Sequence, residues 1–301
     1  MRLLPLAARS LFNRRVTATL TVLAIAVSVA LLLGVQKLRT EARESFASTI
    51  SGTDLIVGAR SGPVNLLLYS VFRIGDPTSN ISWQSYQLVA RHPDVAWTIP
   101  ISLGDSHRGY RVVGTTGAYF EHYRYGERRP LAFSAGGPFS NLHDAEVARA
   151  LGYSVGERIT IAHGIGEGSF AEHDDQPFKV VGVLAPTGTP VDRSVHVSLE
   201  AITAIHEGWE SGMRAPAIGA PPGEALAAAD LTPKAITAFL VGLDSRAAVF
   251  QMQRALNEYR GEALSAVIPG VALQQLWQVV GIADTALLLV AACVVVAGLL
   301  G

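Results

Sequence analysis

One short stretch, "HGIGEGSFAEHDD" from His163 to Asp175, gathers the side chains most suited to binding a metal ion. Its candidate ligands are His163, Glu167, His173, Asp174 and Asp175. Imidazole nitrogen and carboxylate oxygen are ligands that Zn²⁺ accepts at ~2.0–2.2 Å in a tetrahedral arrangement. The flanking stretches "ERITIAH" and "PFKVVGVL" are rich in β-branched residues and predict strands. If these strands form a hairpin, histidines from both ends of the loop meet, and the sequence then predicts a zinc site.

The same stretch also fits a plain solvated connection between two strands. Glycines at 164, 166 and 168 give it turn freedom, and ordering such a loop around a metal costs entropy. No C-x-x-C or H-x-x-x-H spacing fixes the ligands. We favour the plain connection and keep a weak, transient zinc site as the alternative.

The sequence offers little for catalysis. His206 and Glu207 begin an H-E pair, but no second histidine follows four residues later, so the H-E-x-x-H zinc motif is absent. No Gly-Lys pair occurs, which excludes a Walker A phosphate loop. The single cysteine, Cys293, lies in an apolar run. We therefore predict no catalytic residue and no cofactor site in this chain.

Composition indicates a membrane protein. The 301 residues have a mean hydropathy of +0.31, only 16% charged residues and a net charge of -1. No basic stripe with interleaved aromatic residues occurs, so we expect no nucleic-acid partner. Residues 16–35 carry no charge and are long enough to cross ~30 Å of hydrocarbon. Four arginines lie before this segment, and the positive-inside rule then places the N-terminus in the cytoplasm.

The predicted organisation has four parts. Residues 1–15 form a basic amphipathic segment at the cytoplasmic surface, and residues 16–35 form the first transmembrane helix. Residues 36–278 form an outer α+β domain entered and left through helical stalks, and residues 279–301 form the second transmembrane helix. The sequence stops without cytoplasmic residues after that helix, so we expect further spans beyond it.

Several stretches together carry a family resemblance. "LTVLAIAVSVALLLGV", "DLIVGARSGP", "PFKVVGVLAPTGTPVDRSVHVSL" and "IPGVALQQLW" resemble a bacterial subgroup of ABC transporter permeases of the MacB/FtsX/LolC type. The resemblance extends over essentially the whole chain. It implies a protein of the bacterial inner membrane whose residues 36–278 form a MacB-like periplasmic core domain.

The resemblance also implies partners. Permeases of this type work as dimers driven by an ABC ATP-binding subunit, so ATP would bind a partner subunit and not this chain. Periplasmic binding or adaptor proteins are further expected partners, together with the lipid bilayer. The expected function is to couple ATP hydrolysis to movement of the periplasmic domain, in export, extraction or mechanotransmission.

Two alternatives remain open. The stretch "TGTPVDR" is similar to permeases encoded beside zinc-responsive transport genes, which would make this a permease of a zinc-linked transport system. The arrangement of span, outer domain and span also begins many membrane sensors and receptors. Two more spans after residue 301 would favour the permease, and a cytoplasmic signalling helix would favour the sensor.

Overall fold

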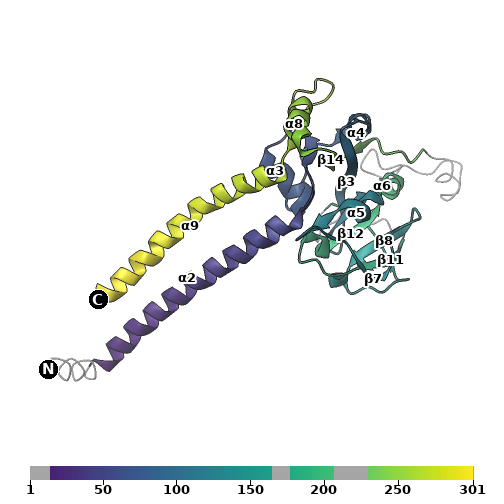
Figure 1. Ribbon diagram of the computed structural model, residues 1–301. Helices are drawn as coiled ribbons and strands as arrows, with labels where there is room; N and C mark the ends of the chain where they lie inside the picture. Colours follow the sequence, from purple (N-terminus) through teal and green to yellow (C-terminus); the bar gives the residue numbers. More distant parts are fainter. Residues whose placement is uncertain (1–13, 165–176, 207–229, 301) are drawn as a thin grey trace. The chain divides into compact units, whose positions relative to one another are not determined.

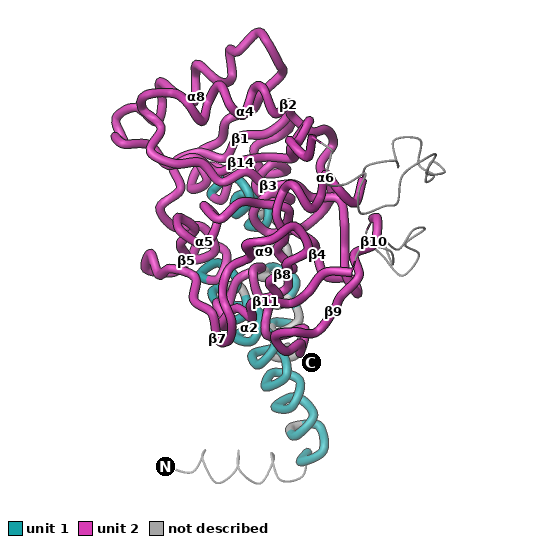
Figure 2. The backbone as a smooth tube through the Cα atoms, turned by 90° about the vertical axis from the view of Figure 1, so that its right-hand side faces the viewer, with its two compact units in different colours: residues 1–44, 274–301 teal, residues 45–273 magenta. Residues whose placement is uncertain are grey.

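The computed structural model describes residues 14–164, 177–206 and 230–300 (Figure 1). The chain divides into two compact units, coloured separately in Figure 2. Unit 1 comprises residues 1–44 and 274–301, and unit 2 comprises residues 45–273. All the described strands belong to unit 2, and the described residues of unit 1 belong to two long helices.

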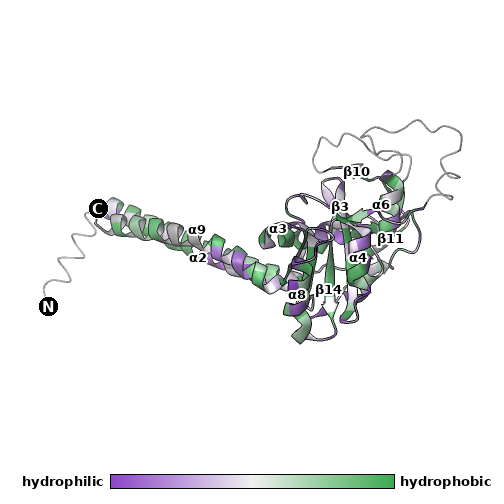
Figure 3. Ribbon diagram, turned by 90° about the horizontal axis from the view of Figure 1, so that it is seen from above, coloured by the Kyte–Doolittle hydropathy of each residue, from purple (hydrophilic) through white to green (hydrophobic). Residues whose placement is uncertain are grey.

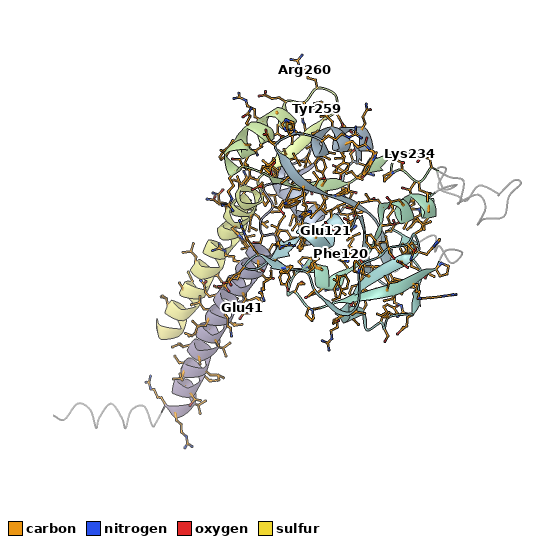
Figure 4. The ribbon with its side chains drawn as sticks, turned by 45° about the vertical axis from the view of Figure 1, so that its right-hand side comes forward. Glu41, Phe120, Glu121, Lys234, Tyr259 and Arg260 are labelled. Atoms are coloured by element: carbon orange, nitrogen blue, oxygen red, sulfur yellow. The ribbon has the colours of Figure 1, made fainter. Side chains whose placement is uncertain are left out.

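The first long helix, α2, runs without a break from Arg15 to Thr49. It contains the predicted span, and its most apolar window has a mean hydropathy of 2.5, so it is long and apolar enough to cross a membrane. Towards unit 2 the helix becomes more polar (Figure 3). There Lys37 and Glu41 form an exposed pair at 3.8 Å, and Figure 4 shows the Glu41 side chain projecting from the helix. The apolar span and the polar stalk are therefore one helix.

The second long helix, α9, runs from Pro269 to Leu300. The predicted second stalk and the predicted span at 279–301 thus fall on one helix too. Among the described residues, α2 is the one helix found long and apolar enough to cross a membrane, so the second span remains a prediction. The two helices run in opposite directions (Figure 1), and the Arg43 guanidinium lies 5.1 Å from the centre of the Trp277 ring. That cation–π contact joins α2 to α9 within unit 1.

One large mixed sheet organises unit 2. Its strand order is β15-β1-β14-β3-β4-β12-β8-β11-β7, with β10 paired to β3 and β9 paired to β11. The bounds are β1 Leu55–Ala59, β3 Val95–His107, β4 Tyr110–Thr115, β7 Phe133–Gly136, β8 Asp144–Ala148, β9 Arg158–Ile159, β10 Ala162–His163, β11 Phe178–Leu184, β12 Ser194–Ser198, β14 Ala238–Leu243 and β15 Leu264–Val267. The long strand β3 belongs to both halves, since it pairs with β14 through its first part and with β4 through its second.

Two small sheets complete the strands. Their members are β2 Ile81–Ser82 with β13 Ala235–Ile236, and β5 Arg124–Tyr125 with β6 Arg129–Pro130. The described helices that lie wholly in unit 2 are α3 Pro63–Leu67, the π-helical η1 Leu68–Phe72, α4 Trp83–Ala90, α5 Ala118–His122, α6 Leu199–His206 and α8 Val249–Asn257. Its described 3₁₀ turns are η2 Arg149–Leu151, η3 Pro190–Arg193 and η4 Arg246–Ala248.

The first half of the sheet is buried on both faces. Along β1, Leu55 and Val57 join one apolar cluster, with α4 and α8, while Ile56 joins the other, with α3, η1 and α5. This alternation follows from the two-residue period of a strand. A strand buried on both sides reads as a continuous apolar run, which explains the stretch "LIV". The second half has its own cluster, in which α6 covers β12 and its neighbours.

Most predicted elements are found, with two differences. The composition of "DAEVARALG", from Asp144 to Gly152, favours a helix, but Asp144–Ala148 is the buried strand β8, between β11 and β12. Burial between two strands outweighs helix propensity there. The strand expected over "ERITIAH" is split into β9 and β10, which pair with different partners. The strands flanking the loop therefore form only the beginning of a hairpin.

Candidate metal centre

Three ligand-type side chains meet where β10 joins β3. His163 on β10 lies directly opposite Asp105 on β3 in an antiparallel register. Directly opposed residues have Cβ atoms ≈ 4.5–5.5 Å apart, so these side chains are neighbours. His206 is the last residue of α6 and completes the group. Together these residues are called the Asp105–His163–His206 triad below.

A bulge in β3 presents Asp105 to this position. The β3–β4 register shifts between Leu103 and Ser106, which leaves one extra residue on the β3 side. Such bulges bend a strand and re-aim a side chain. Asp105 is only 2% exposed, and its backbone neighbour Gly104 accepts a hydrogen bond from Gly164 at 3.0 Å. The bulge region is thus hydrogen-bonded to the residue that directly follows β10.

Close packing of α6 on β4 brings His206 to the same place. A Cβ at Gly114 would lie 2.5 Å from Cγ1 of Ile202 and 3.2 Å from Cβ of Ser102, so only glycine fits here without movement. Ile202 and His206 are four residues apart and share one face of the helix. Because Ile202 sits on β4 at Gly114, His206 is directed towards the adjacent strand β3.

The three ligand atoms form a compact triangle. Nδ1 of His163 is 3.0 Å from Oδ1 of Asp105, and Nε2 of His206 is 3.3 Å from the same oxygen. The two ring nitrogens are 3.2 Å apart. The imidazole rings stack with centroids 4.3 Å apart. The Asp105 side chain is 3% exposed, whereas His163 and His206 are 37% and 33% exposed, so the triangle has one buried corner and two that reach solvent.

The electrostatics of the triad keep the carboxylate ionised. Burial by itself raises the pKa of Asp105, but the polar contacts with His163 and His206 and the charge of these rings outweigh it, so the pKa falls from 3.8 to about 2. For His206, burial acts to lower the pKa, while the contact with Asp105 and its charge raise it above 6.5. A hydrogen bond between the His206 ring and the backbone of Ile202 acts in the same direction.

The predicted zinc ligands can be compared with this group only in part. His163 belongs to the triad. The other four, Glu167, His173, Asp174 and Asp175, lie outside the described residues, and the five-ligand site stays a prediction. Sequence reasoning missed Asp105 and recognised His206 only as a failed H-E-x-x-H motif. One local signal points to Asp105. In "SLGDSH" it follows Gly104 inside a strand, and a glycine inside a strand suggests a bulge.

A serine motif was also overlooked. The segment from Gly152 to Gly156, "GYSVG", has the G-x-S-x-G spacing of a hydrolase nucleophile. That motif requires a sharp turn from a strand into a helix. Here Ser154 instead follows the 3₁₀ turn η2 and precedes β9, and its backbone N–H donates to Glu157. The spacing therefore carries no catalytic role.

Comparison with known proteins identifies the class. A family model for the MacB-like periplasmic core domain matches residues 18–259, and the chain belongs to this family. The match confirms the resemblance to MacB/FtsX-type ABC permeases and describes a transporter component. It favours the permease over the sensor.

Two solved structures are similar. The periplasmic region of MacB from Actinobacillus actinomycetemcomitans is 10% identical, with 76% of this chain and 94% of that chain covered, at a TM-score of 0.46. The extracellular domain of the noncanonic ABC-type transporter YknZ from Gram-positive bacteria is 11% identical, with 71% and 98% covered, at a TM-score of 0.38. No curated protein sequence matches the chain.

Proposed function

We propose that this chain is a permease subunit that transmits ATP-driven motion from the membrane to its periplasmic domain through α2 and α9. The family supports a place in an ABC transporter system with an ATPase partner. The observation that carries the proposal is the way both helices are joined to the core of unit 2. A helix transmits displacement only if its end is fixed to the body that must move.

The end of α2 is fixed by hydrogen bonds and by apolar packing. A helix leaves its last carbonyl groups without partners inside the helix. Here the Ser48 carbonyl accepts from the Gly126 N–H at 2.7 Å, and the Thr49 carbonyl accepts from the Tyr123 hydroxyl. Thr49 is 1% exposed. The last turn of α2 is therefore part of unit 2.

The start of α9 is fixed to the same apolar cluster. Strand β15 ends at Val267 and α9 begins at Pro269, so little chain separates the sheet from the helix. Ala272 is fully buried, and Leu273 packs against the cluster that also receives Phe46 and Ile50 of the α2 segment. The end of α2 and the start of α9 thus pack against the same apolar cluster, so movement of either helix would displace that cluster.

Partial burial along both stalks supports a contact between them. The four-residue spacing of Leu38, Ala42 and Phe46 predicts an apolar stripe, which we expect to face the second stalk around Leu273, Leu276 and Val280. All of these are partly buried except Leu38, which is 68% exposed. Among the described residues, the Arg43–Trp277 pair, one residue beyond Ala42, is one contact between the two helices.

The test breaks α2 between the membrane and the domain. The full-length protein would be purified from its own membranes with its ATPase, which is identified by mass spectrometry. Ala42→Pro removes an i→i−4 hydrogen bond and adds a clash, at a cost of roughly 3 kcal/mol in a helix interior. Ala42→Ser keeps the helix and is the control. We expect both variants to insert in the membrane and to bind the ATPase, and only the proline variant to lose transport-coupled ATP turnover. Equal coupled turnover in both would refute the proposal.

A further inference from the structure

We propose that the Asp105–His163–His206 triad is a binding site for a divalent transition-metal ion, with Zn²⁺ as the best match. This inference is independent of the transport function proposed above. It uses three described residues, of which only His163 was a ligand candidate from the sequence.

The spacing of the ligand atoms is that of a tetrahedral metal site. The metal–ligand distance at a tetrahedral zinc ion is about 2.0–2.1 Å for nitrogen and oxygen ligands. In a tetrahedron the distance between two ligand atoms is about 1.63 times the metal–ligand distance, which gives roughly 3.3–3.4 Å. The three separations in the triad are 3.0, 3.2 and 3.3 Å. An ion at the common centre therefore needs ligand shifts of only a few tenths of an ångström.

The buried carboxylate oxygen is directed at that centre. Oδ1 of Asp105 is buried and lies 3.0 Å from Nδ1 of His163 and 3.3 Å from Nε2 of His206, and its polar contacts with these two rings keep the carboxylate ionised. A buried carboxylate is stable only beside groups of opposite charge or hydrogen-bond donors. An ion inside the triangle would be ligated by this oxygen and by both ring nitrogens together.

The donor set and its exposure define the class of ion. Two imidazoles and one carboxylate suit Zn²⁺ and its neighbours, whereas Mg²⁺ and Ca²⁺ prefer oxygen ligands. Three protein ligands leave a fourth tetrahedral position for water or another donor. Both histidine side chains are also about one-third exposed. Such a site exchanges its ion more readily than a closed structural site.

The surrounding structure orients the ligands before an ion arrives. Asp105 is held by the β3 bulge, His163 by its ladder position opposite Asp105, and His206 by the packing of Ile202 on Gly114. The hydrogen bond between the His206 ring and the Ile202 backbone fixes that ring further. Ligating histidines commonly use their second nitrogen in this way.

The test is metal titration of the full chain in detergent micelles after treatment with a chelator. Calorimetry with Zn²⁺ should show a saturable site, and Co²⁺ should give the visible absorption of a four-coordinate ion. An excess of Mg²⁺ should displace neither. Loss of an outer-shell partner costs roughly 10–100-fold in affinity, and loss of a ligand should cost more. We therefore expect His163→Ala and His206→Ala each to weaken Zn²⁺ binding by more than about 100-fold.

Two further variants make the test specific. His92→Ala removes an exposed histidine outside the triad and should bind Zn²⁺ as the wild type does. A triple variant, His173→Ala/Asp174→Ala/Asp175→Ala, should retain the Co²⁺ spectrum. Zn²⁺ should raise the melting temperature of the wild type but not of the triad variants. No saturable binding, or binding that the loop variant abolishes and the triad variants keep, would overturn the proposal.

Discussion

Glu146 and His196 face each other across the β8–β12 ladder, and both are completely buried. Burial first, and the charge of Asp144 second, raise the pKa of Glu146 from 4.5 to about 9, against a hydrogen bond from the Phe139 N–H that lowers it. Burial and the charge of Arg73 lower the pKa of His196 from 6.5 to about 3. Both groups are therefore neutral near pH 7, which avoids the cost of a buried charge.

The neutral Glu146 predicts how stability changes with pH. Between pH 4.5 and about 9 the folded protein keeps a proton on Glu146 that the unfolded chain has lost, so this group lowers the free energy of unfolding by about 1.4 kcal/mol per pH unit as the pH rises. His196 acts oppositely between about pH 3 and 6.5, where only the unfolded chain takes up the proton. The decrease in the free energy of unfolding that Glu146 causes should thus be clearest above pH 6.5, where His196 no longer opposes it.

Glu146→Gln removes the titration and keeps the size of the side chain. We expect the melting temperature of this variant, relative to the wild type, to increase steadily from pH 6.5 to pH 9. Thermal unfolding followed by circular dichroism at several pH values measures it. Glu157→Gln, at an exposed position, is the control and should follow the wild type at every pH. Parallel curves for Glu146→Gln and the wild type would show that Glu146 is ionised in the fold.

The close approach of α6 to β4 predicts a specific rescue. Gly114→Ala places a methyl group against Ile202, and overpacking of this kind typically costs about 1–3 kcal/mol. We expect a fall of a few degrees in melting temperature. Ile202→Ala makes room for the added methyl group, so the double variant should be more stable than the sum of the two single changes implies.

Gly117→Ala is the control for this pair, because a Cβ there has nothing within 4 Å. It should leave the melting temperature nearly unchanged. If the decreases in melting temperature caused by Gly114→Ala and Ile202→Ala simply add in the double variant, then α6 does not pack on β4 through these two residues.

The topology predicted from four N-terminal arginines can be tested with cysteine labelling. In a Cys293→Ala background, Ser79→Cys at an exposed position of unit 2 should react with an impermeant thiol reagent added outside intact cells. Ser10→Cys in the basic N-terminal segment should react only after the membrane is opened. The opposite pattern would place the N-terminus outside the cytoplasm.

Local sequence patterns predicted the continuous elements well. The apolar spacing after Ser245 favours a helix, and η4 and α8 are found there. The Ser245 hydroxyl accepts from the Ala247 N–H, and Val249, Met252 and Leu256 are buried along one face of α8. Its periodicity and cap are local properties, so the sequence reveals them. The strand at Asp144–Ala148 was missed because its burial depends on β11 and β12, which are distant in the sequence.

The Asp105–His163–His206 triad shows the same limit more sharply. Its members are separated by more than forty residues at each step, and the distances between them follow from a strand pairing, a bulge and the packing of a helix on a glycine. His163 was noticed because it begins a loop rich in other ligand types. Asp105 and His206 have no such neighbours in the sequence that identify them.

The hydrogen bond from Tyr123 to the Thr49 carbonyl gives the last prediction, which concerns the anchor of α2. Tyr123 is 4% exposed, and burial raises its pKa well above 10, so the hydroxyl keeps its proton and donates. Tyr123→Phe leaves the buried carbonyl of Thr49 without this donor, at a cost of about 1–3 kcal/mol. We expect faster hydrogen exchange in the last turn of α2 and weaker coupling of ATP turnover to transport, with the rest of unit 2 unchanged. Tyr125→Phe is the matched control, since among the described residues its hydroxyl donates no hydrogen bond to α2. If both variants show the same hydrogen exchange in the last turn of α2 and couple ATP turnover to transport as the wild type does, the Tyr123 hydroxyl does not anchor the helix.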